Sequence, residues 1–293
     1  MTYKEPLSQK AIGISISDSA EMVVLGLSDE HLQDAMAEVA RHMLALGARL
    51  VYGGDLRTGG FTDLLFELVV RHRRDADVGD RRSAIVNYLP WPVHAAKPAK
   101  EIQALAQDLK GLADLRCLDE QGQELALAGL PLTANTQLPT QESWTVSLTA
   151  LRRVLTDACD ARIVLGGRIS GFKGRMPGIA EEALFSLRAN QPLFVLGGFG
   201  GCARDIAEDL KLIAPRSSLT VQWLGREQFA AFSSNALRNG LDDQENETLA
   251  RTVHVDEAVA LVLRGLLRIF GSTPVPHWDQ DFGASINGSP SPK

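Results

Sequence analysis

Three segments of this 293-residue chain share one plan: a short apolar run, a Gly-Gly pair, a polar or glycine-rich loop, and then a helical pattern. The segments are RLVYGGDLRTGGFTDLL (49–65), RIVLGGRISGFKGRMPGIAEEAL (162–184) and PLFVLGGFGGCARDIAEDL (192–210). Each apolar run is short enough to form a strand that is buried on both faces. Strands that alternate with helices in this way predict an α/β fold: a Rossmann-like open, mostly parallel sheet with helices on both faces.

The rest of the chain continues this alternation, and we expect one domain over residues 1–270. Apolar runs predict strands at residues 11–15, 49–52, 84–89, 162–165 and 193–196. Periodic apolar positions predict helices at residues 28–47, 62–70, 101–109, 148–159, 179–189, 203–213, 227–237 and 255–270. Residues 119–145 are polar and irregular, with a short strand near 124–128, and are interpreted as an insertion. The Gly-, Pro- and Ser-rich tail, 271–293, is expected to be disordered or a linker.

Charge and composition narrow the class of protein. The net charge of −6 argues against a general nucleic-acid binder, which would carry a basic face. The three cysteines are widely spaced and no His/Cys cluster suggests a metal site, so neither a metal nor another cofactor is expected. The first residues lack the apolar core of a signal peptide, and the apolar stretch 258–270 is too short and too charged to span a bilayer. We therefore expect a cytoplasmic protein that does not enter a membrane.

Paired glycines at strand ends have a specific physical use. Without a Cβ the backbone adopts positive φ and lets a ligand approach the main chain, and the following helix adds its positive amino end. In an open parallel sheet, the loops at the carboxyl ends near the change of strand order bind ligands. Tight strand-to-helix turns are the alternative explanation. The glycines predicted to bind a ligand are Gly53, Gly54, Gly166, Gly167, Gly178, Gly197, Gly198 and Gly200.

Charged and polar side chains on these loops predict an anionic ligand. The middle loop holds Arg168, Lys173 and Arg175 and no acidic residue, a set suited to phosphate or carboxylate; a solvated basic loop is the alternative. No loop matches the dinucleotide pattern or the Walker loop, so an ordinary NAD dehydrogenase or P-loop NTPase does not fit. Further candidates at the same edge are the donors Arg57 and Thr62, the ribose acceptor Asp55, and Ser15, Ser17 and Asp18 after the first strand.

At these residues the chain resembles the SLOG superfamily, the DprA/LOG-like Rossmannoid nucleotide-binding proteins. The likeness covers roughly residues 10–215 and rests on ISISDS, YGGDLRTGGFT, SLTALRR, ARIVLGGRISGFKGRMPGIAEEAL and FVLGGFGG. The resemblance implies one of two functions. Some members are sensor domains that bind nucleotides or nucleotide-derived second messengers, and others, the LOG enzymes, are phosphoribohydrolases that cleave the N-glycosidic bond of nucleoside monophosphates. It also implies a dimer or higher oligomer and, for a sensor, an effector partner protein.

The enzymes of the superfamily carry a PGG-x-GT-x-x-E motif and an arginine on the preceding helix. Carried onto this chain, Gly166-Gly167 and Gly178 stand for the motif glycines, and the resemblance implies Glu182 as the catalytic glutamate. The arginine it implies is Arg152, on the flank of its helix, whereas Arg153 points away from the apolar face. The chain departs from the motif by the eight-residue insert RISGFKGR and by Ile179 in place of the threonine. These departures weaken the enzyme hypothesis more than the binding hypothesis.

Three hypotheses stay open: a nucleotide sensor or binding module, a nucleotide N-glycosidase, and a scaffold that kept the fold and lost the site. The six histidines are scattered without metalloprotease spacing and favour none of them. Trp91 and Trp144 are candidates for stacking on a base, with packing as the alternative.

Overall fold

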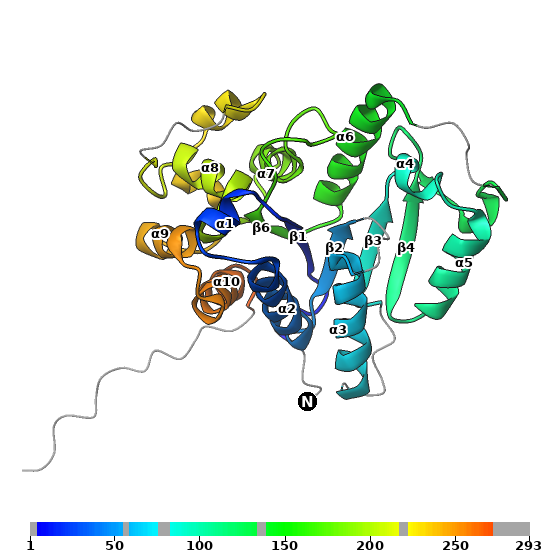
Figure 1. The fold of residues 1–293 in the computed structure, drawn as a ribbon. Coiled ribbons are helices and arrows are strands. Elements are labelled where there is room, and N and C mark those ends of the chain that lie inside the picture. Colours follow the sequence, from blue (N-terminus) through cyan, green and yellow to red (C-terminus); the bar gives the residue numbers. More distant parts are fainter. Residues whose placement is uncertain (1–4, 55–58, 76–82, 134–138, 217–221, 272–293) are drawn as a thin grey trace, which may run out of the picture.

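The computed structural model describes residues 5–54, 59–75, 83–133, 139–216 and 222–271 (Figure 1). A seven-stranded sheet runs through the molecule in the order β5-β4-β3-β2-β1-β6-β7. All neighbouring strands pair in parallel except β5, which is antiparallel to β4. The strands are β1 (Ala11–Ser17), β2 (Arg49–Gly53), β3 (Ile85–Leu89), β4 (Ala113–Leu118), β5 (Glu124–Leu125), β6 (Ala161–Gly166) and β7 (Leu193–Leu196).

Helices cover both faces of the sheet, as Figure 1 shows. One face packs on α2 (Asp29–Ala45), α3 (Phe61–Asp75), α5 (Ala99–Asp108) and α10 (Val255–Phe270). The other packs on α6 (Gln141–Asp157), α7 (Gly178–Arg188) and α8 (Gly201–Asp209). The remaining helices are α1 (Glu21–Val24), α4 (Trp91–His94) and α9 (Asp243–Arg251), with short 3-10 turns at Leu127–Gly129, Gly197–Phe199, Arg226–Ala231 and Ser234–Leu237. The predicted α/β class is confirmed.

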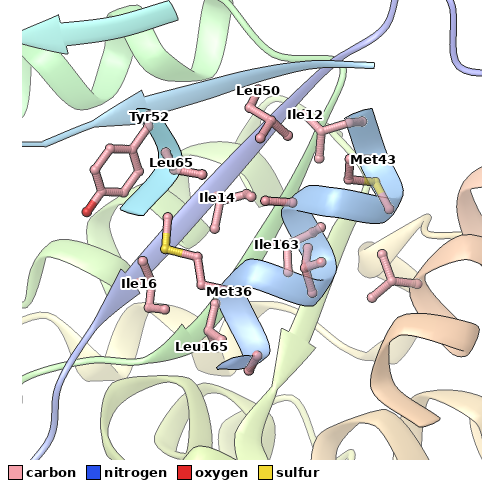
Figure 2. Packing of buried hydrophobic residues seen from close by; sticks show 14 of the residues in the cluster. Ile12, Ile14, Ile16, Met36, Met43, Leu50, Tyr52, Leu65, Ile163 and Leu165 are labelled. Carbon is pink, nitrogen blue, oxygen red and sulfur yellow. The ribbon is translucent and has the colours of Figure 1, made fainter. Parts of the chain in front are cut away.

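Alternating side chains on the strands build two cores. Ile12, Ile14 and Ile16 of β1 point to the face covered by α2, where Met36 and Met43 pack against them (Figure 2). Gly13, Ser15 and Ser17 therefore point to the opposite face, toward α6 and α7. Ser15 and Ser17 thus lie on the face of the sheet that α6 and α7 cover, and the predicted basic loop connects β6 to α7 on this face.

The chain changes direction across the sheet beside β1. From β1 it passes to β2, β3 and β4 on one side, and then returns to β6 and β7 on the other side. The change of strand order lies between β1 and β6, where ligands bind in sheets of this kind. Gly53 ends β2, Gly166 ends β6 and Gly197 follows β7, so the three Gly-Gly loops share the carboxyl edge.

Some predicted elements differ from the structure. The sequence pattern missed β4, α1, α4 and α9, and placed the start of α6 inside the irregular segment 119–145. Residues 227–237 are not one helix, because two 3-10 turns occupy this stretch. Within the described ranges, no helix is both long and apolar enough to cross a membrane. The predicted tail lies beyond the described residues, apart from Gly271.

Candidate functional site

Main-chain contacts join the loops on either side of the change of strand order. Gly167 N–H donates to the Ser17 carbonyl over 2.8 Å, and Cys202 N–H donates to the Gly167 carbonyl over 2.9 Å. Gly166 and Gly167 have φ of +65° and +107°, and a Cβ on Gly166 would lie 2.4 Å from the Ser17 oxygen. Both positions therefore require glycine. The loops after β1 and β6 and the start of α8 form one continuous backbone surface.

Arg152 lies beneath the loop that connects β6 to α7. It is 7% exposed, and its guanidinium pairs through Nη1 with Glu181 in the first turn of α7. A Cβ on Gly178 would lie 2.9 Å from Nη2, and one on Gly174 would lie 2.6 Å from Nη1. These two glycines let the guanidinium reach the amino end of α7. Its Nη2 and Nε make no hydrogen bond to any described residue, so donors remain for an anion there.

The two adjacent glutamates of α7 have different partners. Glu181 accepts from Thr149 Oγ1 at 2.8 Å as well as from Arg152. Glu182 instead accepts, on Oε2, from Ser15 Oγ at 2.5 Å and from Arg162 Nη1 at 2.6 Å. The carboxylate beside Arg152 is therefore that of Glu181, although the family motif points to Glu182.

Arg162 is a buried cation that the sequence analysis did not single out. It is 1% exposed and donates to Ser15, Ser186 and Glu182 from the start of β6. Ser15 is 4% exposed, and its hydroxyl donates to Glu182 and accepts from Arg162, so Ser15 lies inside this network and not at the edge where it was predicted. In the sequence, the one indication of this role is that Arg162 is a charged residue in the otherwise apolar strand β6.

The basic loop is partly neutralised. The loop itself holds no acidic residue, but Arg168 forms a bidentate pair with Asp18 from the loop after β1, with nitrogen–oxygen distances of 2.9 to 3.1 Å. Lys173 Nζ lies 3.8 Å from the centre of the Trp144 ring, which ties the loop to α6. Arg175 is exposed and has no ion pair with the described residues. The pair of Arg168 and Asp18 is itself about half exposed.

The other glycine pairs serve close packing. A Cβ on Gly53 would lie 2.5 Å from Leu155, and one on Gly198 would lie 2.0 Å from the Thr252 carbonyl. Gly197 packs in the same way against the Ala250 carbonyl, and Gly54 against Tyr52 and Thr62. Close packing therefore explains why these four positions hold glycine, and their contact with a ligand stays a prediction. Two further candidates, Asp55 and Arg57, lie outside the described residues.

Three buried hydroxyls near the carboxyl edge have no hydrogen-bond partner among the described residues. They belong to Ser19 after β1, Thr62 at the start of α3, and Ser147 on α6, and these residues are 7%, 2% and 1% exposed. Only Thr62 was predicted as a site residue. Ser147 precedes Leu151 and Leu155 by one and two helical turns, and those leucines cover Gly53 at the end of β2. Buried polar groups are normally paired, so each of these hydroxyls can still bond to a water molecule or a ligand.

The arrangement fits an anion site, and the described residues include no cluster of three or more metal-ligating side chains. A comparison with family models matches residues 6–257 to SLOG cluster2. A comparison with curated proteins gives no match. The family model spans most of the chain and includes the β1–β6 junction, the basic loop and α7. The chain therefore belongs to the SLOG cluster2 family, which confirms the resemblance to the SLOG superfamily.

Proposed function

We propose that this protein binds a nucleotide or nucleotide-derived ligand over the β1–β6 junction and acts as a sensor module. The observation that carries the proposal is the position of Arg152, which is buried under a glycine loop at the amino end of α7. Its Nη2 and Nε have no partner in the ranges that the structure describes. A guanidinium and the first N–H groups of a helix are a strong combination for a phosphoryl group.

The surroundings support a ligand larger than inorganic phosphate. Lys173 and Arg175 on the exposed loop add positive charge at the rim. The unpaired hydroxyls of Ser19, Thr62 and Ser147 are suited to the polar atoms of a sugar or base. Membership of SLOG cluster2 supports a nucleotide-type ligand.

Calorimetric titration with nucleoside mono- and diphosphates tests the proposal. Arg152→Gln removes the guanidinium but keeps an amide that can donate to Glu181, and we expect affinity to fall about tenfold or more, the scale of a charged hydrogen bond. Arg153→Gln is the matched control, since Arg153 lies on the exposed side of α6 over the Phe185 ring. Equal affinity in both variants would contradict the proposal. Lys173→Ala with Arg175→Ala, on exposed positions, provides a second test that does not disturb the core.

A nucleotide N-glycosidase is the second candidate, favoured by one observation. Glu182 Oε1 has no hydrogen-bond partner among the described residues, so one carboxylate oxygen of the motif glutamate remains available. Incubation with the same nucleotides separates the two functions. Release of free base that disappears in Glu182→Gln supports catalysis, whereas binding without base release supports sensing.

A further inference from the structure

The amino end of α8 is occupied by a side chain of the protein itself. Gly200 and Gly201 have φ of +72° and +62° and shape the turn that starts this helix. Gly201 N–H donates to Glu21 Oε2 over 2.8 Å, and Arg216 pairs with the other oxygen, Glu21 Oε1. The Glu21 carboxylate thus lies where helix amino ends elsewhere bind anions.

This carboxylate leaves one nearby donor unused. Ser19 is 7% exposed, and within the described part of the chain its Oγ has no hydrogen-bond partner. A Cβ on Gly201 would lie 3.0 Å from that Oγ, so the hydroxyl borders the start of α8. Both oxygens of Glu21 are already engaged by Gly201 and Arg216. A phosphoryl group carries three acceptor oxygens and would satisfy all three donors.

Arg216 does not depend on Glu21 for its position. Its Nε donates to Glu208 Oε1 at 3.0 Å and its Nη2 pairs with Asp205. Glu208 and Asp205 are 4% and 2% exposed, and Asp205 also accepts from Trp223 Nε1 at 2.8 Å. Glu208 and Asp205 therefore hold the Arg216 guanidinium in place without Glu21. An anion that replaces Glu21 restores the negative charge that Glu21 supplied.

We propose that Gly201 N–H, the Ser19 hydroxyl and the Arg216 guanidinium form a second oxyanion subsite, which Glu21 fills until a phosphoryl group displaces it. The subsite borders the loop that runs from β6 to the first one, because a Cβ on Gly201 would lie 2.3 Å from the Gly167 carbonyl. Resting on the proposed function for the first subsite, this assignment narrows the ligand class to nucleotides with two phosphoryl groups.

Titration calorimetry with inorganic pyrophosphate tests the subsite directly. Glu21→Ala vacates it, and we expect pyrophosphate to bind about tenfold more tightly than to the wild type, since its competitor is gone. Adding Ser19→Ala should remove most of that gain. Ser19→Ala alone should leave stability unchanged, because the Ser19 hydroxyl bonds to no other described residue. Asp29→Asn, on an exposed residue, is the control for removing one negative charge.

The outcomes separate this proposal from the first. Unchanged pyrophosphate affinity in Glu21→Ala overturns the subsite. A gain in affinity that remains when Ser19→Ala is added also overturns it, and so does an equal gain in Asp29→Asn. A gain in pyrophosphate affinity that requires Ser19 supports the subsite. This result does not depend on the first proposal, which fails separately if Arg152→Gln leaves nucleotide affinity unchanged. A subsite that takes the second phosphoryl group also predicts that Glu21→Ala strengthens binding of nucleoside diphosphates but not of monophosphates.

Discussion

Arg162 is the largest of the fully buried side chains in the described structure, and its charge is matched inside the protein. Glu182 balances the guanidinium, and the hydroxyls of Ser15 and Ser186 take two of its remaining donors. A buried charge is tolerated only when it is paired and hydrogen-bonded. This network fixes the side of α7 that faces β1, and with it the orientation of the helix end next to Arg152.

We expect Arg162→Met to lower the free energy of unfolding by about 3–5 kcal/mol, since it leaves Glu182 without its partner under the sheet. The double variant Arg162→Met with Glu182→Met should recover most of this loss. Urea denaturation measures both. Arg168→Met is the matched control: its pair with Asp18 is about half exposed, and its loss should cost less than about 1 kcal/mol. A similar small loss for Arg162→Met would show that the buried pair does not support the fold.

Single residues also mark the limit of sequence analysis at the site. The spacing of α6 placed Arg152 toward the site and Arg153 away from it, as the structure has them. Periodicity could not assign partners to Glu181 and Glu182, because adjacent helical residues differ by only about 100° in direction. Their partners depend on how the loop after β6 folds, which no local pattern encodes.

At the scale of elements, α9 and α10 are joined by Glu245. Its carboxylate accepts from Arg268 and Arg264 of α10, and it also accepts from the Asp242 N–H at the start of α9. The Asp242 side chain in turn caps Glu245 N–H. These bonds, with Arg268 first, lower the pKa of Glu245 from its usual 4.5 to about 2.

Because this pKa is lower in the folded state, Glu245 stabilises the protein fully above pH 4.5 and loses its effect as the pH falls toward 2. Glu245→Gln should therefore be less stable than the wild type at pH 7, and the difference should shrink steadily below pH 4.5. Thermal unfolding between pH 7 and pH 3 measures it. Glu247→Gln, in an exposed pair with Arg251, should have little effect at any of these pH values. A pH-independent difference for Glu245→Gln would mean that its charge is not what joins the helices.

The elements that the sequence revealed are those with strong apolar periodicity. The predicted bounds of α10 match the structure, since its apolar face is nearly continuous. The pattern missed α9, DQENETLAR, because few of its residues are apolar, and missed β4, where Asp114 and Arg116 interrupt the apolar run near the sheet edge. In both, pairing with neighbouring elements outweighs local propensity.

At the scale of the whole molecule, the candidate site belongs to one edge of the sheet. The loop after β1, the loop after β6 and the amino ends of α7 and α8 gather there, whereas α5 packs against β4 on the far side of the sheet. Figure 1 shows α5 well separated from α7 and α8. Because α5 lies far from the candidate site, it can serve as an internal reference when the position of a bound ligand is measured.

We expect hydrogen exchange to slow at residues 17–21 and 166–180 when a nucleotide ligand is bound, with α5 unaffected. At a free ligand concentration of about 100 times Kd, binding stabilises the protein by about 2.7 kcal/mol. The exchange rate can therefore fall by at most about 100-fold for amides that exchange only from the unbound state. Mass spectrometry of exchanging peptides measures this. If exchange slowed in α5 as much as at residues 17–21 and 166–180, the ligand would bind elsewhere or stabilise the whole molecule.

The junction of Ser17, Gly167 and Cys202 is built from peptide groups and not from side chains. Mutation cannot easily alter main-chain contacts of this kind, apart from their glycines, so under the proposed function the backbone frame of the site is inherited with the fold. Discrimination between one ligand and another then resides in the few side chains around that frame. A small number of substitutions there would be enough to retune what the protein recognises while its architecture stays the same.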